Sequence, residues 1–266
     1  MDCQPSAILP RDMPGLCCGH CVGLPLSGNL WAKALAKAMT GLGLTALETH
    51  ESIFARGEAG LGFIIVACYV DDLLVAYTNK DDAERLLADV QKEITMKVQA
   101  GNKFEHLGAI VMSNEDGTFY LQQTKLANDI VKTLSLSTTK TKSTPLPFNS
   151  QSITKCEGDE LASDLQKIYR SAVGKIGYLT YTRPDLLFAR SLLARFIKNP
   201  TMAHWKLLIH VGKYIAGTQS LGLNFTKGKG MSAFAYSDSD HATDKDDRKS
   251  ITGAALVACW RQLYLG

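Results

Sequence analysis

Two short apolar runs separated by an acidic break dominate the hydrophobic pattern of the chain. Residues 63–68 read Phe-Ile-Ile-Val-Ala-Cys and residues 73–76 read Leu-Leu-Val-Ala. Continuous apolar runs of this length, with β-branched side chains, are typical of buried strands. Because only residues 69–72 lie between them, the pattern predicts a β-hairpin with Asp71 and Asp72 at its tip and their carboxylates near solvent.

Adjacent carboxylates at a strand end carry an electrostatic cost. They repel each other and lose hydration unless a cation lies between them. Mg²⁺, a hard divalent ion, prefers carboxylate oxygens as ligands. The local pattern therefore fits a metal site, and it also fits an ordinary acidic turn between buried strands.

Apolar positions at helical spacing predict helices on both sides of this hairpin. An alanine-rich helix ends near Met39, with Trp31 and Leu35 near one face. A second helix begins at Asp81, with Glu84 as a capping-box partner. Its predicted core stripe is Ala83, Leu86, Leu87, Val90 and Ile94.

The second half of the chain is predicted to be mainly helical. Residues 135–160 are rich in Ser, Thr, Lys and Pro and predict a linker. Three helices follow between residues 161 and 217, and Thr182 and Asp185 are expected to cap the second of them. Strands are predicted at 110–112 and 119–121, and again at 221–225 and 233–236.

Composition narrows the protein class without identifying a partner. The 266 residues are 45% hydrophobic and 21% charged, with a net charge of +3, which is typical of a globular protein. This charge permits a nucleic-acid partner but does not require one. No secretory signal or apolar run of about 18 residues is evident, and the seven cysteines are scattered. We therefore expect an intracellular, cytoplasmic or nuclear, protein that is neither secreted nor membrane-bound.

Residues 1–21 are predicted to form a disordered leader, because prolines and glycines interrupt any periodicity. Cys17, Cys18, His20 and Cys21 are zinc-ligating residue types. Adjacent Cys17 and Cys18 have poor geometry for one tetrahedral ion, however, and no second paired cluster follows.

Tyr69-Val70-Asp71-Asp72 after an apolar strand resembles the active-site hairpin of reverse transcriptases. Further blocks are similar, in order, to copia-type LTR retrotransposon Pol polyproteins. They are the residues from Val22 into the first helix, Phe104 to Gly108, Thr144 to Pro147, Tyr169 to Asp185, and Tyr236-Ser237-Asp238. The resemblance covers about residues 22–260.

This resemblance implies an α+β fold with several regions. The leader, residues 1–21, would precede a partial reverse-transcriptase palm and thumb at 22–134. The linker at 135–160 would lead to a helical connection at 161–228. Residues 229–266 would form an incomplete ribonuclease H-like β-sheet.

The resemblance also implies an activity, namely RNA-directed DNA synthesis on a template–primer with deoxynucleotides and Mg²⁺ or Mn²⁺. Asp71 and Asp72 would be the catalytic, metal-binding residues. The primer and substrate contacts would be Tyr69, Val70, Leu107 and Gly108. Asp238 would be a vestigial metal ligand of ribonuclease H.

The chain departs from the family pattern in ways that predict a truncated and inactive fragment. Leu26 stands where the family usually has a glutamine near the nucleotide. The family's upstream catalytic aspartate has no counterpart before residue 22. The alternative is a non-catalytic nucleic-acid-binding remnant of a transposon. An unrelated hydrolase using acids between 238 and 247 lacks a nucleophile–base pattern.

Overall fold

The computed structural model describes residues 4–10, 27–58, 62–70, 72–93, 96–99, 101–148, 150, 153–155, 158–226, 232–242, 246, 248 and 250–259. The fold is α+β, as predicted, and it divides into two compact units. The first unit is Met1–Leu107 with Val111–Phe119, and the second is Gly108–Ile110 with Tyr120–Gly266. No helix among these described residues is long and apolar enough to cross a membrane.

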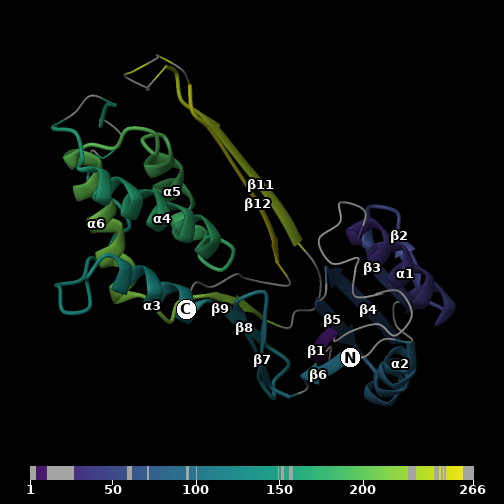
Figure 1. The fold of residues 1–266 in the computed structure, drawn as a ribbon. Helices are drawn as coiled ribbons and strands as arrows, with labels where there is room; N and C mark the ends of the chain where they lie inside the picture. Colours follow the sequence, from purple (N-terminus) through teal and green to yellow (C-terminus); the bar gives the residue numbers. More distant parts are fainter. Residues whose placement is uncertain are drawn as a thin grey trace. The chain divides into compact units, whose positions relative to one another are not determined.

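The first unit is built on a six-stranded antiparallel sheet with two helices (Figure 1). The strand order is β2-β3-β4-β5-β1-β6. The strands are β1 (Gln4–Pro10), β2 (Thr45–Leu47), β3 (His50–Glu58), β4 (Gly62–Tyr69), β5 (Asp72–Tyr77) and β6 (Met96–Gln99). The helices are α1 (Ser27–Gly41) and α2 (Lys80–Glu93).

Both helices contribute to one apolar core with the sheet. The buried side chains of this core are Leu35, Met39, Leu44, Phe54, Ile64, Val66, Leu73, Val75, Ala83, Leu86 and Val90. In β4, Ile64 and Val66 are buried while their immediate neighbours are only half-buried. This alternation is expected for a sheet whose helices cover one face. The predicted stripe of α2 is confirmed except at Ile94, which lies outside the described residues.

The prediction of a disordered leader is wrong for residues 4–10. These residues form β1, which lies between β5 and β6 and pairs antiparallel with both. The backbone of β1 occupies an edge of β5 that would otherwise leave N–H and C=O groups unpaired. The rest of the predicted leader, including Cys17, Cys18, His20 and Cys21, lies outside the described residues.

The start of α2 also differs from the predicted capping box. Asn79 Oδ1, rather than a side chain at Asp81 or Glu84, accepts a hydrogen bond from the Asp82 N–H at 3.2 Å. Asparagine is a favoured residue at this position because its short side chain reaches the free amides of the first turn. Asp82 is then free to pair with Arg56 of β3, at 2.6 Å.

A four-stranded sheet has the order β10-β9-β8-β7. Its strands are β7 (Lys103–His106), β8 (Ala109–Ser113), β9 (Phe119–Gln122) and β10 (Leu223–Phe225). The predicted turn between β8 and β9 is confirmed, because the Asn114 N–H donates to the Thr118 carbonyl at 2.9 Å.

The second unit contains a helical bundle, here the helices α3 (Thr124–Thr133), α4 (Ser163–Leu179), α5 (Leu187–Ala194) and α6 (Met202–Gly217). A 3-10 turn, η2 (Pro184–Leu186), precedes α5. The described part of 135–160 contains no α-helix or strand, and its Leu136, Leu146 and Ile153 pack on the bundle core. The strands β11 (Ser232–Ser239) and β12 (Thr252–Cys259) form a separate antiparallel pair.

Candidate functional site

The predicted acidic hairpin is confirmed for its two strands. β4 and β5 pair antiparallel, and the last pair in their register is Tyr69 with Asp72. Asp72 is therefore the first residue of β5, and its side chain is half-buried. Tyr69 and Val70 are 61% and 66% exposed, so the tip faces solvent. Asp71 lies outside the described residues.

The backbone at the tip is held in an unfavourable conformation. Val70 has a φ of 51°, in the left-handed region. A β-branched side chain is rarely found there, because its Cβ crowds the backbone. A residue in such a sparsely populated region costs about 1–3 kcal/mol and persists only when neighbouring contacts fix it.

Trp31 of α1 supplies one such contact. Its indole Nε1–H donates a hydrogen bond to the Val70 carbonyl at 2.6 Å. The sequence places Trp31 on the packing face of its helix, and the structure confirms that position. The bond itself joins residues 39 positions apart and has no local sequence signal. Trp31 therefore links the core of the first unit to the acidic turn.

Replacing Trp31 with Phe is expected to loosen the hairpin tip without unfolding the first unit. Phenylalanine keeps an aromatic ring but has no N–H, and one hydrogen bond contributes about 1 kcal/mol. Amide hydrogen exchange near the turn should become about fivefold faster, which corresponds to that free energy. Trp205→Phe serves as the control, since Trp205 belongs to the second unit. Equal exchange in parent and W31F proteins would contradict the role of this bond.

His106, at the end of β7, is electrostatically coupled to the hairpin. Its burial lowers the pKa of the imidazole, because desolvation disfavours the protonated form. The negative charge of Asp72 acts in the opposite direction and raises the pKa. The sequence assigns no role to His106, and the structure brings it within electrostatic range of Asp72.

Cys68 lies in β4, just before the tip. Burial raises the pKa of its thiol to about 12. The thiol therefore stays protonated near neutral pH, and a protonated thiol is a poor nucleophile. Cys68 is therefore poorly suited to act as a nucleophile at this site.

Leu107 and Gly108 form the turn between β7 and β8. Both have positive φ, 47° at Leu107 and 70° at Gly108. A Cβ at Gly108 would make only ordinary van der Waals contact with the Tyr178 ring, at 3.5 Å, so it is the positive φ that favours glycine there. The sequence alone does not predict the left-handed conformation of Leu107.

Asp238 lies on β11, where it pairs with Gly253 of β12, and it is exposed. Across the described part of the chain, no three His, Cys, Asp or Glu side chains gather in a way that could hold a metal ion. Neither Asp72 nor Asp238 therefore belongs to a multi-residue metal cluster among those residues.

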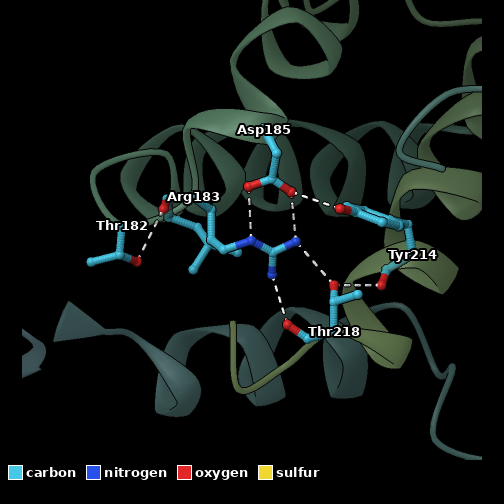
Figure 2. A network of polar contacts seen from close by, with 6 residues as sticks. Thr182, Arg183, Asp185, Tyr214 and Thr218 are labelled. Atoms are coloured by element: carbon cyan, nitrogen blue, oxygen red, sulfur yellow. Dashed lines mark hydrogen bonds and ion pairs between the residues drawn. The ribbon is translucent and has the colours of Figure 1, made fainter. Parts of the chain in front are cut away.

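A second polar site, the Arg183 network, lies in the helical bundle (Figure 2). Arg183 Nε and Nη2 donate to the two carboxylate oxygens of Asp185, at 2.9 and 2.7 Å. Nη1 and Nη2 also donate to the carbonyl and hydroxyl oxygens of Thr218, at 2.7 and 2.9 Å. Tyr214 Oη donates to Asp185 at 2.8 Å.

This network replaces the predicted cap of the second helix. The Thr182 hydroxyl donates to Gln123 Oε1 at 3.0 Å and does not cap η2. The Asp185 carboxylate accepts hydrogen bonds from Arg183 and Tyr214 instead of capping the helix. Burial raises the pKa of the Tyr214 hydroxyl. The network joins the turn before α5 to the end of α6, which is a structural role.

The sequence is similar to several known proteins. The family described as "Reverse transcriptase (RNA-dependent DNA polymerase)" matches residues 20–147. The chain is 27% identical over 253 residues to the retrovirus-related Pol polyprotein from transposon RE1 of Arabidopsis thaliana, covering 94% of this chain and 17% of that protein. No solved structure matches the chain.

Two other relatives are also similar to most of this chain. The retrovirus-related Pol polyprotein from transposon TNT 1-94 of Nicotiana tabacum is 32% identical over 216 residues, covering 79% of this chain and 16% of that protein. The uncharacterized mitochondrial protein AtMg00810 of Arabidopsis thaliana is 33% identical over 185 residues, covering 70% of this chain and 75% of that protein. The chain thus spans 17% or less of these two Pol polyproteins.

Proposed function

Since the chain belongs to the reverse transcriptase family of copia-type retrotransposon Pol polyproteins, we propose that it is part of an RNA-directed DNA polymerase. Its partners would be an RNA or DNA template–primer and deoxynucleotides. The observation that carries this proposal is the solvent-facing hairpin tip, where Asp72 follows a strained turn held by Trp31.

Asp71 and Asp72 are the proposed catalytic residues and ligands of Mg²⁺ or Mn²⁺. Such ions bind through one or two carboxylates, together with waters and substrate phosphates. The half-buried Asp72 carboxylate at an accessible tip suits this kind of ligation. A bound ion would stabilise the negative charge that develops during phosphoryl transfer.

The other residues of the site would position the nucleic acid. Tyr69 and Val70, both exposed, would border the primer terminus. Leu107 and Gly108 would contact the primer strand through their left-handed turn. Asp238 would be a vestigial metal ligand of ribonuclease H on the exposed hairpin of β11 and β12.

The proposed regions follow the resemblance. Residues 22–134 would be a partial palm and thumb, and 161–228 a helical connection after the linker at 135–160. Residues 229–266 would begin a ribonuclease H-like sheet. The six-stranded sheet of the first unit supports the palm assignment, because it presents Asp72 at the end of two adjacent strands.

The 266-residue polypeptide by itself is proposed to be inactive. Two-metal catalysis holds its ions about 3.5–4 Å apart with carboxylates from separate strands. Adjacent side chains of one strand point to opposite faces and cannot do this alone. Among the described residues, which do not include Asp71, no three His, Cys, Asp or Glu side chains form a group that could hold a metal ion.

Primer extension on poly(rA)–oligo(dT), with Mg²⁺ or Mn²⁺, tests the inactivity. We expect no extension by the parent protein or by Asp71→Asn. If the parent protein extends the primer and Asp71→Asn does not, the proposal of inactivity is wrong, but the proposal that Asp71 binds the metal ion stands. It would mean that another carboxylate completes the site.

Manganese binding tests the site without requiring turnover. Electron paramagnetic resonance should detect weak Mn²⁺ binding that is lost when Asp71 and Asp72 are both changed to Asn. Asp116→Asn is the matched control, because Asp116 is an exposed acid in another hairpin turn. Equal Mn²⁺ binding in all three proteins would contradict the assignment of the acidic tip.

The alternative function is a non-catalytic nucleic-acid-binding remnant. Leu26, which stands where the family usually has a glutamine near the nucleotide, favours it. The test is template–primer binding with and without Mn²⁺, in the parent and in the Asp71→Asn/Asp72→Asn double variant. Equal binding in all four cases would support the non-catalytic remnant over the metal-dependent enzyme.

A further inference from the structure

A groove on the surface of the helical bundle is lined by several positively charged side chains, which have no part in the proposed site at the acidic hairpin. It is lined by Lys142, Trp205, Lys206, Ile209, His210 and Lys213 and has a volume of about 410 Å³. We call it the cationic groove. A second cavity of about 510 Å³ shares Lys206 and His210 with it and is lined further along by Asp159 and Met202.

The spacing of residues on α6 produces one wall of the cationic groove. Lys206, His210 and Lys213 follow the i, i+4, i+7 pattern, which places them on one face of a helix. At 1.5 Å per residue, Lys206 and Lys213 are separated by about 10 Å along the axis. The opposite face of α6 is buried in the bundle core through Leu207, Leu208 and Val211.

The other wall is the segment around Lys142, which is fixed to α6. The Lys142 N–H donates to the Lys213 carbonyl at 3.3 Å. His210 Nε2 lies 3.1 Å from the Thr144 carbonyl, which accepts its hydrogen. These bonds hold a residue of the predicted linker against the helix, so the groove is preformed rather than assembled from free side chains.

The charge of the cationic groove is not neutralised from within. Its lining contains three lysines and no carboxylate, and none of the ion pairs between described residues involves these lysines. Burial lowers the pKa of His210, and the charges of Lys142 and Lys213 lower it further. Both lysines therefore lie near enough to His210 to act on it electrostatically.

The floor of the cationic groove is aromatic and apolar. Trp205 and Ile209 are half-buried, with part of each side chain packed on the bundle core. A cationic channel with an aromatic platform is the arrangement that binds single-stranded nucleic acid, because lysines contact phosphates and bases stack on the ring. An acidic peptide would use the lysines but would stack on the indole only where it carried an aromatic residue, whereas every nucleotide carries both a phosphate and a base.

We propose that the cationic groove binds a single-stranded segment of nucleic acid, through its sugar–phosphate backbone and a base stacked on Trp205. This rests on the proposed function, since it supplies a second contact for the same substrate class. The groove lies within the second unit, whereas the acidic hairpin belongs to the first. The two sites can therefore be tested by separate variants.

The test measures binding of the full chain to a fluorescent 15-nucleotide oligonucleotide at several salt concentrations. Lys142→Glu/Lys206→Glu changes two exposed side chains and should weaken binding at least tenfold. It should also flatten the salt dependence, since each phosphate contact on a single strand contributes a slope of about 0.7. Trp205→Leu should weaken binding with the slope unchanged.

Lys132→Glu/Lys167→Glu is the matched control, because it makes the same change of net charge at two exposed lysines outside the groove. This control should bind like the parent, and circular dichroism should show that every variant is folded. Equal weakening of both double variants would overturn the proposal in favour of diffuse attraction. Parent-like binding by K142E/K206E would also overturn it, while leaving the proposed polymerase function intact.

Competition identifies the occupant. An unlabelled oligonucleotide should displace the probe from the parent protein at a much lower concentration than poly-glutamate of the same charge, and a free deoxynucleotide should not displace it. The proposal would be overturned if poly-glutamate displaced the probe and the unlabelled oligonucleotide did not. If K142E/K206E also weakened the binding of poly-glutamate, the groove would instead bind an acidic protein partner. A parent protein that binds neither the oligonucleotide nor a template–primer would overturn both the groove and the proposed function.

Discussion

Arg183→Met is expected to lower the free energy of unfolding of the helical bundle by about 3–5 kcal/mol. The guanidinium is 1% exposed and its partner Asp185 is 13% exposed. Methionine fills most of the volume but leaves the Asp185 carboxylate with only the Tyr214 hydroxyl. It also removes both bonds to Thr218 at the end of α6. An uncompensated carboxylate in a nearly dry site is the main cost.

Hydrogen exchange of peptides from α4 and α6, at increasing urea, measures this loss for the second unit alone. Arg170→Met is the matched control. Arg170 also makes side-chain bonds within the bundle, to the carbonyls of Ile197 and Lys198 at 3.1 and 3.0 Å, but it is exposed. Water replaces its bonds, so the expected loss is about 1 kcal/mol or less. A loss in R183M no larger than in R170M would contradict the structural role of the network.

A double variant separates the buried charge from the lost packing. Arg183→Met/Asp185→Leu removes the carboxylate that the single variant leaves without its partner. Replacing a buried ion pair by apolar residues is often nearly neutral, whereas removing one partner is strongly destabilising. The double variant should therefore be more stable than R183M. If it is less stable, the cost lies in the contacts to Thr218 rather than in Asp185.

Features with a local signal were predictable from the sequence. The strands β4 and β5 and the buried stripe of α2 follow from apolar runs and helical spacing, since burial on one face requires those patterns. The exposure of Tyr69 and Val70 at the tip follows from their position between two buried strands. A resemblance in several ordered blocks then identified the family, which the comparisons confirm.

Features that depend on distant partners were not predictable. β1 pairs with β5, whose residues are more than sixty positions away, and the prolines at both ends of its apolar stretch pointed to disorder. Thr182 and Asp185 have the spacing of a capping box. In the structure, however, Asp185 pairs with Arg183, which also bonds to Thr218, 35 positions away. Local preference is a weak guide wherever a buried ion pair or a strand partner competes with it.

The same limit applies to the candidate site. The spacing of residues 69–72 predicts the turn, but the Trp31 bond and the charge coupling of His106 arise only from the packing of separate elements. The cationic groove likewise combines α6 with Lys142, which the sequence assigned to a linker. The sequence does not show that these lysines cluster, because more than sixty residues separate Lys142 from the lysines of α6.

Gly57→Ala is expected to destabilise the first unit by about 3 kcal/mol, because it combines backbone strain with a steric clash. Gly57 has a φ of 100°, which side-chain-bearing residues rarely adopt. An added Cβ would lie 2.2 Å from the Gly62 carbonyl oxygen and 2.9 Å from Phe63 Cα. Both are backbone atoms of the paired strand β4, so no side-chain rotation can relieve the contact.

The disruption should be confined to one end of the sheet. Gly57 pairs with Phe63, at the end of β4 opposite to the acidic turn, whereas β5 keeps its pairing with β1. Hydrogen exchange should therefore accelerate most in β3 and the start of β4, and least in β5. Gly28→Ala is the control, since no atom lies within 4 Å of its Cβ position in α1 and alanine favours a helix. Equal exchange in G57A and G28A would contradict the close approach of β3 to β4, and uniform acceleration through β5 would show that the six strands unfold as one.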